Sequence, residues 1–244
     1  MKLREIFETW ARRVGDKFHD QQWLLSKWDC QEGILWPEDK FRAMVDGILE
    51  DFDISPGNTV ADLGCGGGWI LQKLARRPQQ VIGVDFSRTM LENAGRLNPE
   101  QTFVCADIAR LPFKKEVFDR VLCYFVFINF VDDDLIVQSL NDIVRLLKPG
   151  GRALIGQLPD GEESEVYDRE KKRYIQYCRE EFSLSDDLRK VCRVPLRLFN
   201  RQNLEEILRT LDVSYQFRDS FNPFYRAGEP ERISWRFDLL LERK

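Results

Sequence analysis

The chain has 244 residues, of which 43% are hydrophobic and 32% are charged, enough for a full hydrophobic core. It carries 37 Lys and Arg against 41 Asp and Glu, which gives a formal net charge of −4. This acidic balance disfavours a general electrostatic grip on the phosphates of DNA or RNA. We expect one domain over residues 1–244, acting as a monomer or a homodimer.

The lengths of the apolar runs and the pattern of cysteines indicate in which cellular compartment the protein is expected. No apolar run approaches the length of a membrane span, and the N-terminus mixes acidic and basic side chains, unlike a signal peptide. The six cysteines form no CxxC pair, so a reducing cytoplasm without membrane contact is the simplest setting. Cys65, Cys105 and Cys123 fall in predicted strands or in a glycine-rich turn, and we expect them to be small buried apolar side chains.

Residues 1–54 are expected to form a helical cap, because apolar residues recur there at helical spacing. Four of the six tryptophans lie within the first 36 residues. Two interpretations remain open for them: the indoles pack helices onto a sheet, or they cover a ligand, with Trp36-Pro37 nearest to it. The only histidine, His19, lies in the same segment.

The next segment, 60–69 (VADLGCGGGW), is a short apolar run that ends in an acid and a glycine-rich turn before an amphipathic helix. This order is typical of the nucleotide-binding corner of a doubly wound α/β sheet. A P-loop would require Gly-Lys-Ser or Gly-Lys-Thr, and Gly68 is followed by Trp69 instead. A dinucleotide fingerprint would place its third glycine at position 69, where a large indole obstructs close helix packing.

Strands and helices then alternate, which predicts a parallel sheet with right-handed crossovers. The predicted strands are 59–63, 80–84, 102–105, 118–124 and 152–156, and the predicted helices between them include 69–76 and 87–95. Ser87 is the expected N-cap of the helix that contains Met90. Acids follow the second and third strands, at Asp85 and Asp107, and a Lys-Pro-Gly-Gly turn precedes the fifth.

The spacing Asp62-x-Gly64-x-Gly66-x-Gly68 resembles the first motif of class I S-adenosylmethionine-dependent methyltransferases, and the later motifs follow in that family's order. The resemblance spans residues 60–156. It implies S-adenosylmethionine as cofactor, with S-adenosylhomocysteine as product. It also implies an α/β fold with a seven-stranded, mostly parallel sheet of order 3-2-1-4-5-7-6, an N-terminal helical cap and a helical insert after the fifth strand.

The same resemblance implies roles for individual residues. Asp85 would bind both ribose hydroxyls, Asp107 the adenine amino group, and Asp62 the methionine amino group through water. The amide after Asp107, that of Ile108, would meet the ring. The full set expected around the cofactor is Trp36, Asp62, Gly64, Cys65, Gly66, Gly68, Asp85, Phe86, Met90, Asp107, Ile108 and Cys123.

The rest of the chain bears on the acceptor. Methyltransferases of nucleobase or glutamine amines tend to carry Asn/Asp-Pro-Pro-Tyr after the fourth strand, where this chain has Cys123-Tyr124-Phe125-Val126. The acids at 132–134 resemble a metal cluster but are explained by the dipole of a helix that starts there. Residues 161–200 are expected to form an acceptor lid over the carboxyl edge of the sheet, or else a solvated helix. Residues 201–244 are expected to form a helix capped by Asn200 and an antiparallel hairpin.

The leading hypothesis is therefore methyl transfer to a small-molecule hydroxyl, with His19 as the base and Tyr124 or Tyr167 as weaker candidates. Methylation of nitrogen or carbon, and a non-catalytic cofactor-binding partner subunit, remain as alternatives. An NAD-dependent oxidoreductase is disfavoured by Trp69. We expect no bound metal.

Overall fold

The computed structural model describes residues 38–74, 80–130, 132–182, 197–222 and 232–244. Its strands are β1 (Thr59–Leu63), β2 (Gln80–Asp85), β3 (Thr102–Cys105), β4 (Phe118–Tyr124), β5 (Leu147–Pro159), β6 (Val213–Phe221) and β7 (Arg232–Arg243). They form one sheet of order β3-β2-β1-β4-β5-β7-β6, in which β7 runs antiparallel to both of its neighbours and the other pairs are parallel. The predicted doubly wound α/β sheet and its strand order are confirmed.

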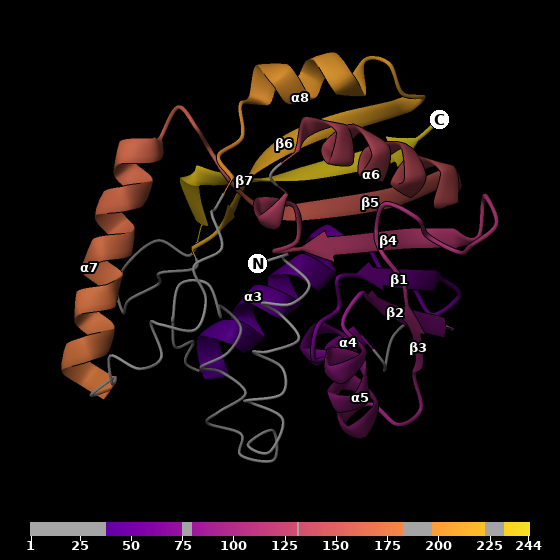
Figure 1. Cartoon of the computed structure of the whole chain (residues 1–244), viewed down its shortest axis with the longest axis horizontal. Coiled ribbons are helices and arrows are strands. Elements are labelled where there is room, and N and C mark those ends of the chain that lie inside the picture. The colour runs from indigo at the N-terminus through magenta and orange to yellow at the C-terminus, as the bar shows by residue number, and fades with distance from the viewer. Residues whose placement is uncertain (1–37, 75–79, 131, 183–196, 223–231) are drawn as a thin grey trace.

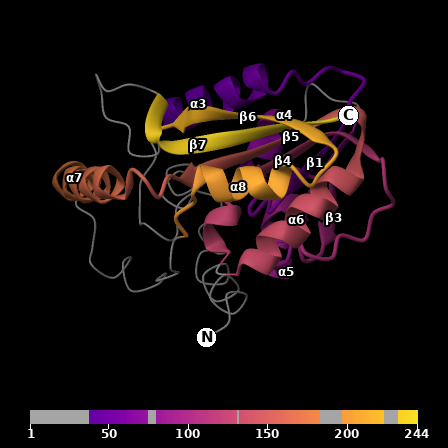
Figure 2. The ribbon, with the colours of Figure 1, turned by 90° about the horizontal axis from the view of Figure 1, so that it is seen from above.

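Helices cover both faces of this sheet. They are α3 (Glu38–Asp51), α4 (Trp69–Leu74), α5 (Arg88–Leu97), the 3-10 turn η1 (Phe127–Asn129), α6 (Asp133–Leu146), α7 (Ser164–Phe182) and α8 (Arg201–Leu208). Seen along the sheet, α3 lies on one side and α6 and α8 on the other (Figure 2). One core packs α3 and α4 against the sheet, and a second packs α6 and α8 against the opposite face. Each face of the central strands is thereby removed from water, as their nearly continuous apolar sequences predict.

Local capping signals explain where several helices begin. The Ser87 side chain accepts a hydrogen bond from the Met90 amide, and the Asn200 side chain accepts one from the Asn203 amide. Both predicted N-caps are confirmed. Asp132 caps α6 in the same way, and no group of three potential metal ligands occurs among the described residues.

Strand β5 differs from the prediction. The sequence predicted a strand at 152–156 with a Lys-Pro-Gly-Gly turn before it, but β5 runs from Leu147 to Pro159 and includes that segment. The continuation is possible because the register with β7 shifts between Ile155 and Leu158, and Gln157 takes a positive φ of 66°. Such a bulge re-aims the chain without ending the pairing. Gln157 is therefore part of the sheet.

Cys105 corrects a second expectation. Its side chain is exposed, whereas Cys65 and Cys123 are buried as predicted. Cys105 is the last residue of β3, and β3 is an edge strand with a neighbour on one side only. An edge strand leaves its end open to solvent, so an apolar-looking run there does not guarantee burial.

The insert helix α7 stands apart from the sheet, on the side toward which β4 points (Figure 1). Its first turn reaches the core, where Val166 and Tyr167 pack beside Trp235. None of the described helices combines the length and the apolar composition that a membrane crossing requires. The expected helices within residues 1–37 lie outside the described residues, while the predicted helix that contains Met44 and Ile48 is confirmed as α3.

Two helical glycines provide a test of how tightly α3 packs. A Cβ atom on Gly47 of α3 would lie 2.1 Å from Cζ of Phe221, whereas a Cβ on Gly95 of α5 would meet nothing within 4 Å. Gly47→Ala should therefore lower the free energy of unfolding by about 1–3 kcal/mol. Gly95→Ala should raise it by up to about 1 kcal/mol through helix propensity. Urea unfolding measures both, and equal effects would contradict this packing.

Candidate functional site

The glycine loop between β1 and α4 is shaped by three left-handed residues. Gly64, Gly66 and Gly68 have φ values of 77°, 52° and 78°, a region that side chains disfavour. The amides of Gly64 and Cys65 both donate to the Val84 carbonyl, at 2.7 and 3.0 Å, so the loop folds back onto β2. This conformation places the loop at the carboxyl end of the sheet, where α/β proteins bind ligands.

Each glycine also faces a close neighbour. A Cβ on Gly64 would lie 2.3 Å from Val126, and one on Gly68 would lie 2.8 Å from the Asn98 amide nitrogen. At Gly66 the nearest atom is the terminal methyl of Met90, 3.3 Å away. Side chains would therefore displace the chain segments on both sides of the loop. The absence of side chains lets the loop backbone meet a ligand directly.

Asp85, the last residue of β2, joins this loop to the start of α5. Its Oδ2 accepts the Gly66 amide at 3.0 Å, and its Oδ1 accepts the Ser87 amide at 2.8 Å. Asp85 is 8% exposed, so a small part of the side chain remains at the surface of the site. A carboxylate oxygen has two lone pairs. Asp85 can thus hold the loop and also accept hydrogen bonds from ligand hydroxyls.

Asp62, on β1, is the most unusual carboxyl group of the site. It is 3% exposed, and its buried Oδ2 has no hydrogen-bond partner among the residues that the structure describes. Burial, together with the nearby charge of Asp85, raises the pKa of Asp62 to about 8. A buried acceptor without a donor is costly, and it fits a ligand that brings a donor or a positive charge.

The adenine-side residues lie on an open loop after β3. Asp107 is exposed, and its Oδ1 accepts the Ala109 amide at 3.0 Å. Gln138 of α6 donates to the Ala109 carbonyl at 2.9 Å, so the loop is attached to that helix. Ile108 is half-buried against the core. Asp107, Asp85 and Asp62 accordingly lie at or near the carboxyl ends of three adjacent strands, and of the three only Asp107 is exposed.

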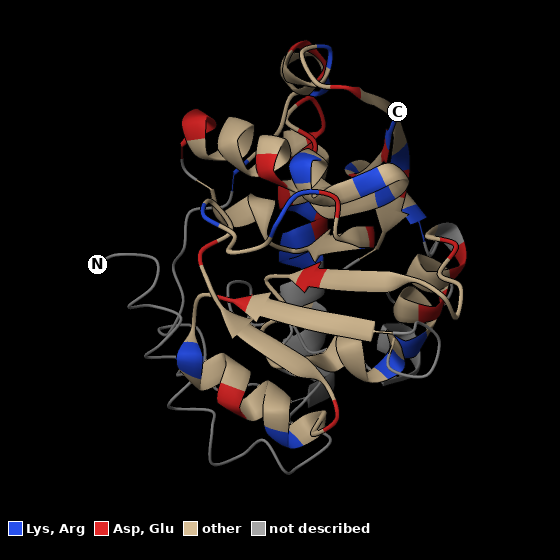
Figure 3. Ribbon diagram, turned by 90° about the vertical axis from the view of Figure 1, so that its right-hand side faces the viewer, with Lys and Arg blue, Asp and Glu red and all other residues tan. Residues whose placement is uncertain are grey.

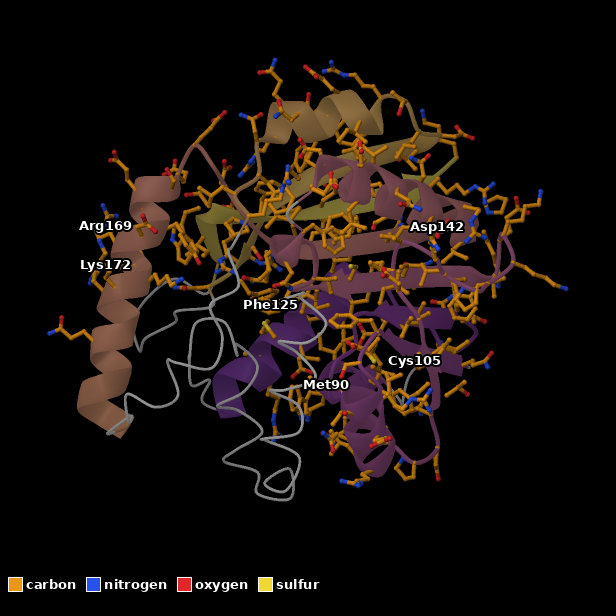
Figure 4. All side chains as sticks on the ribbon, viewed as in Figure 1. Met90, Cys105, Phe125, Asp142, Arg169 and Lys172 are labelled. Carbon is orange, nitrogen blue, oxygen red and sulfur yellow. The ribbon has the colours of Figure 1, made fainter. Side chains whose placement is uncertain are left out.

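The tip of β4 lies next to the glycine loop. Burial raises the pKa of the Cys123 thiol well above its ordinary value, with a smaller contribution from the charge of Asp62. Phe125 has a positive φ of 60°, which bends the chain so that Val126 covers Gly64. Phe125 lies beyond the end of β4, and Met90 lies near the start of α5 (Figure 4).

Tyr124 and Tyr167 are both engaged in contacts that the sequence did not predict. The Tyr124 hydroxyl donates to Oδ2 of Asp238 at 3.1 Å, and Arg236 donates to the Tyr167 hydroxyl at 3.3 Å. Asp238 and Arg236 belong to β7 and are buried. The available signal was their charge within an otherwise apolar strand, which is rare for fully buried positions.

His19 and Trp36, expected at the acceptor and the cofactor, lie outside the described residues. Phe86 is half-buried directly after Asp85. The described members of the expected set therefore meet at the carboxyl ends of β1, β2, β3 and β4. The loop and its two carboxyl groups supply backbone contact, hydroxyl acceptors and a buried acceptor for a cation, and these are the features that an adenosyl amino acid requires.

Known proteins share both the central sequence and the fold. Residues 60–151 match the family model of a methyltransferase domain. The methyltransferase GfsG of Streptomyces halstedii is 29% identical over 171 residues, which cover 63% of this chain and 60% of that protein. A 2-phytyl-1,4-naphtoquinone methyltransferase of Nostoc sp. is 38% identical over 163 residues, 63% of each chain. The chain thus spans about 60% of the length of these relatives.

Solved structures extend the likeness to the whole chain. Magnesium protoporphyrin IX methyltransferase (ChlM) from Synechocystis, with bound S-adenosylmethionine, has a TM-score of 0.64 at 18% identity and covers 99% of this chain and 95% of its own. A chain of the complex between the Haloferax volcanii Trm112 activator and a methyltransferase has a TM-score of 0.65 at 18% identity, with coverages of 97% and 96%. At these identities the likeness is one of fold. The domain match at residues 60–151 and the strand order of the sheet around it make this chain similar, in its central sequence and in its fold, to S-adenosylmethionine-dependent methyltransferases.

Proposed function

We propose that this protein transfers the methyl group of S-adenosylmethionine to the hydroxyl oxygen of a small-molecule acceptor. The observation that supports this most directly is the cradle formed by the glycine loop, the anchored carboxylate of Asp85 and the partnerless Oδ2 of Asp62. When bound there, the cofactor supplies an electrophilic methyl group on its sulfonium. The protein's own contribution is to hold the acceptor in line with that methyl group, which can lower a barrier by roughly 7–11 kcal/mol.

Within this proposal each residue has a distinct task. Asp85 accepts the ribose hydroxyls, the glycine loop lies along the amino-acid part, and Asp62 binds the methionine amino group through water. Met90, whose methyl lies over Gly66, packs against the adenine face. Asp107 and the amide of Ile108 bind the adenine edge.

Several observations favour a small, neutral or weakly charged acceptor. The relatives named above include methyltransferases of a naphthoquinone and of a magnesium porphyrin, both small molecules. Acidic and basic segments are interleaved on the face seen in Figure 3, an arrangement that favours no polyanion. The tip of β4 carries Tyr124-Phe125-Val126 instead of the amine-methylating motif, which favours oxygen over nitrogen.

A second function is favoured by one comparison. The Haloferax volcanii methyltransferase fold occurs in complex with an activator protein, Trm112. A role as a cofactor-binding subunit that acts with a partner is therefore the alternative. Copurification of a stable partner, together with no turnover on any acceptor without it, would distinguish this alternative from a self-sufficient enzyme.

Binding of the product tests the cofactor site. Asp85→Asn removes the charge and leaves one acceptor oxygen where Gly66 and Ser87 now use two. Calorimetry should show the dissociation constant of S-adenosylhomocysteine rising by at least about tenfold, since hydrogen bonds to charged groups contribute roughly 1.5–3 kcal/mol each. Asp134→Asn, an exposed change on α6, is the matched control and should bind as the wild type. Equal affinities for the two variants would contradict the assignment.

Protonation of Asp62 makes stability depend on pH. Its pKa is raised from 3.8 to about 8, so between these values the folded chain holds a proton that the unfolded chain has lost. Folding stability from this group is therefore lost as pH rises through that window, by at most about 1.4 kcal/mol per pH unit. Asp62→Asn should gain stability relative to the wild type between pH 5 and pH 8. Urea unfolding measures the free energy of unfolding of both proteins across this pH range. If the two plots against pH run parallel, Asp62 does not have the raised pKa.

The base of the reaction is proposed to be His19. Of the reserve candidates, the Tyr124 hydroxyl already donates to Asp238 and the Tyr167 hydroxyl already accepts from Arg236. His19→Ala should lower the rate of S-adenosylhomocysteine formation with phenolic acceptors by at least about tenfold. Affinity for S-adenosylhomocysteine should stay within about twofold of the wild type. Wild-type turnover by this variant would remove His19 from the mechanism.

A further inference from the structure

A buried polar network lies beside the cofactor site, at the carboxyl end of β5. We call it the Asp238 network; its members are Tyr124, Gln157, Tyr167, Ser220, Arg236 and Asp238. They come from β4, β5, β6, β7 and α7, and each is at least nine-tenths buried. None of them belongs to the residues proposed to touch the cofactor.

Asp238 is the centre of this network. Its Oδ1 accepts the Gln157 amide at 2.8 Å and the Ser220 hydroxyl, and its Oδ2 accepts the Tyr124 hydroxyl at 3.1 Å. Burial raises the pKa of Asp238 to about 6, although these donors oppose the shift. The group therefore remains ionised at neutral pH inside the protein.

A buried charge of this kind is not required for stability. Replacing a buried charged group by well-packed apolar residues often leaves the folded protein equally stable or makes it more stable. The carboxylate fixes the relative positions of strands, because it accepts hydrogen bonds from donors on three different strands. A fixed arrangement of strands is useful where those strands end at a binding site.

One arm of the network leads to the glycine loop. The Tyr124 ring crosses β5 at Gly156, where a Cβ atom would lie 1.8 Å from the ring. Its hydroxyl is thereby brought to Asp238 on β7. The next residue, Phe125, packs edge-on against the Tyr124 ring and carries the positive φ that places Val126 over Gly64. Holding Tyr124 consequently holds the bend that covers the loop.

The other arm leads to the insert helix. Gln157 donates to Ser220 and to the Phe221 carbonyl, and its Oε1 accepts from Arg236 at 3.2 Å. Arg236 in turn donates to the Tyr167 hydroxyl and lies over the Tyr167 ring, 5.1 Å from its centre. Tyr167 is in the first turn of α7, so this arm attaches that helix to the same end of the sheet.

We propose that Asp238 is a positioning residue for the cofactor and acceptor sites. Through Tyr124 it holds the bend over Gly64, and through Gln157 and Arg236 it holds the start of α7. The inference rests on the proposed function, because it assumes that the glycine loop takes the cofactor. It assigns a role in binding to residues that no ligand touches.

The test uses the full chain and three variants. Tyr124→Phe removes one hydroxyl, Asp238→Asn removes the central charge, and Tyr215→Phe is the matched control on β6, outside the network. The dissociation constant of S-adenosylhomocysteine is measured by calorimetry well below the unfolding midpoint. Amide hydrogen exchange is followed without ligand in residues 125–130 and 164–171.

Tyr124→Phe should raise the dissociation constant roughly three- to tenfold and speed exchange in 125–130 only. Asp238→Asn should raise it by at least as much and speed exchange in both segments, and Tyr215→Phe should match the wild type. If Tyr124→Phe unfolds at a lower temperature but binds as the wild type, the network is merely structural and the proposal is overturned. If the wild type itself fails to bind, the proposed cofactor site is wrong instead. If Asp238→Asn does not fold, the Tyr124→Phe variant by itself still tests the proposal.

Discussion

The hydrogen bonds of the Asp85 carboxylate connect the parts of the cofactor site. One oxygen holds the Gly66 amide of the glycine loop, and the other holds the Ser87 amide at the start of α5. Without this carboxylate the loop and the helix would depend on separate contacts with the sheet. A single side chain thus sets the distance between the segments proposed to lie along the amino-acid and nucleoside parts of the cofactor. Charge-assisted hydrogen bonds are the stronger class, which suits them to this role.

Two further carboxyl groups occupy costly positions around this centre. Asp62 has a buried oxygen without a partner, and Asp238 stays ionised in the interior with three donors around it. Their environments differ in the donors available. Oδ2 of Asp62 has no donor among the described residues, which fits a group that receives a ligand. Asp238 accepts its hydrogen bonds from the protein itself, which fits a group that holds strands in place.

The division of the chain into sheet, cap and insert follows the same logic. The central parallel strands are buried on both faces and provide a rigid base. Helix α7 stands on the side toward which β4 points (Figure 1). The start of α7 touches the core at Val166 and Tyr167, so these contacts contribute to its placement. Arg236 donates to the Tyr167 hydroxyl, so the network on β7 helps to hold the start of α7.

Much of this arrangement was predictable from residues close together in the chain. The glycine spacing after β1, the acids after β2 and β3, and the caps at Ser87 and Asn200 are local patterns, and local sterics and hydrogen bonding decide them. The tertiary structure alone decided the bulge at Gln157, the exposure of Cys105 on an edge strand and the pairing of Tyr124 with Asp238, which are 114 positions apart. These features depend on which strands become neighbours and on what covers them. That information lies in the packing of the whole sheet and in no single segment.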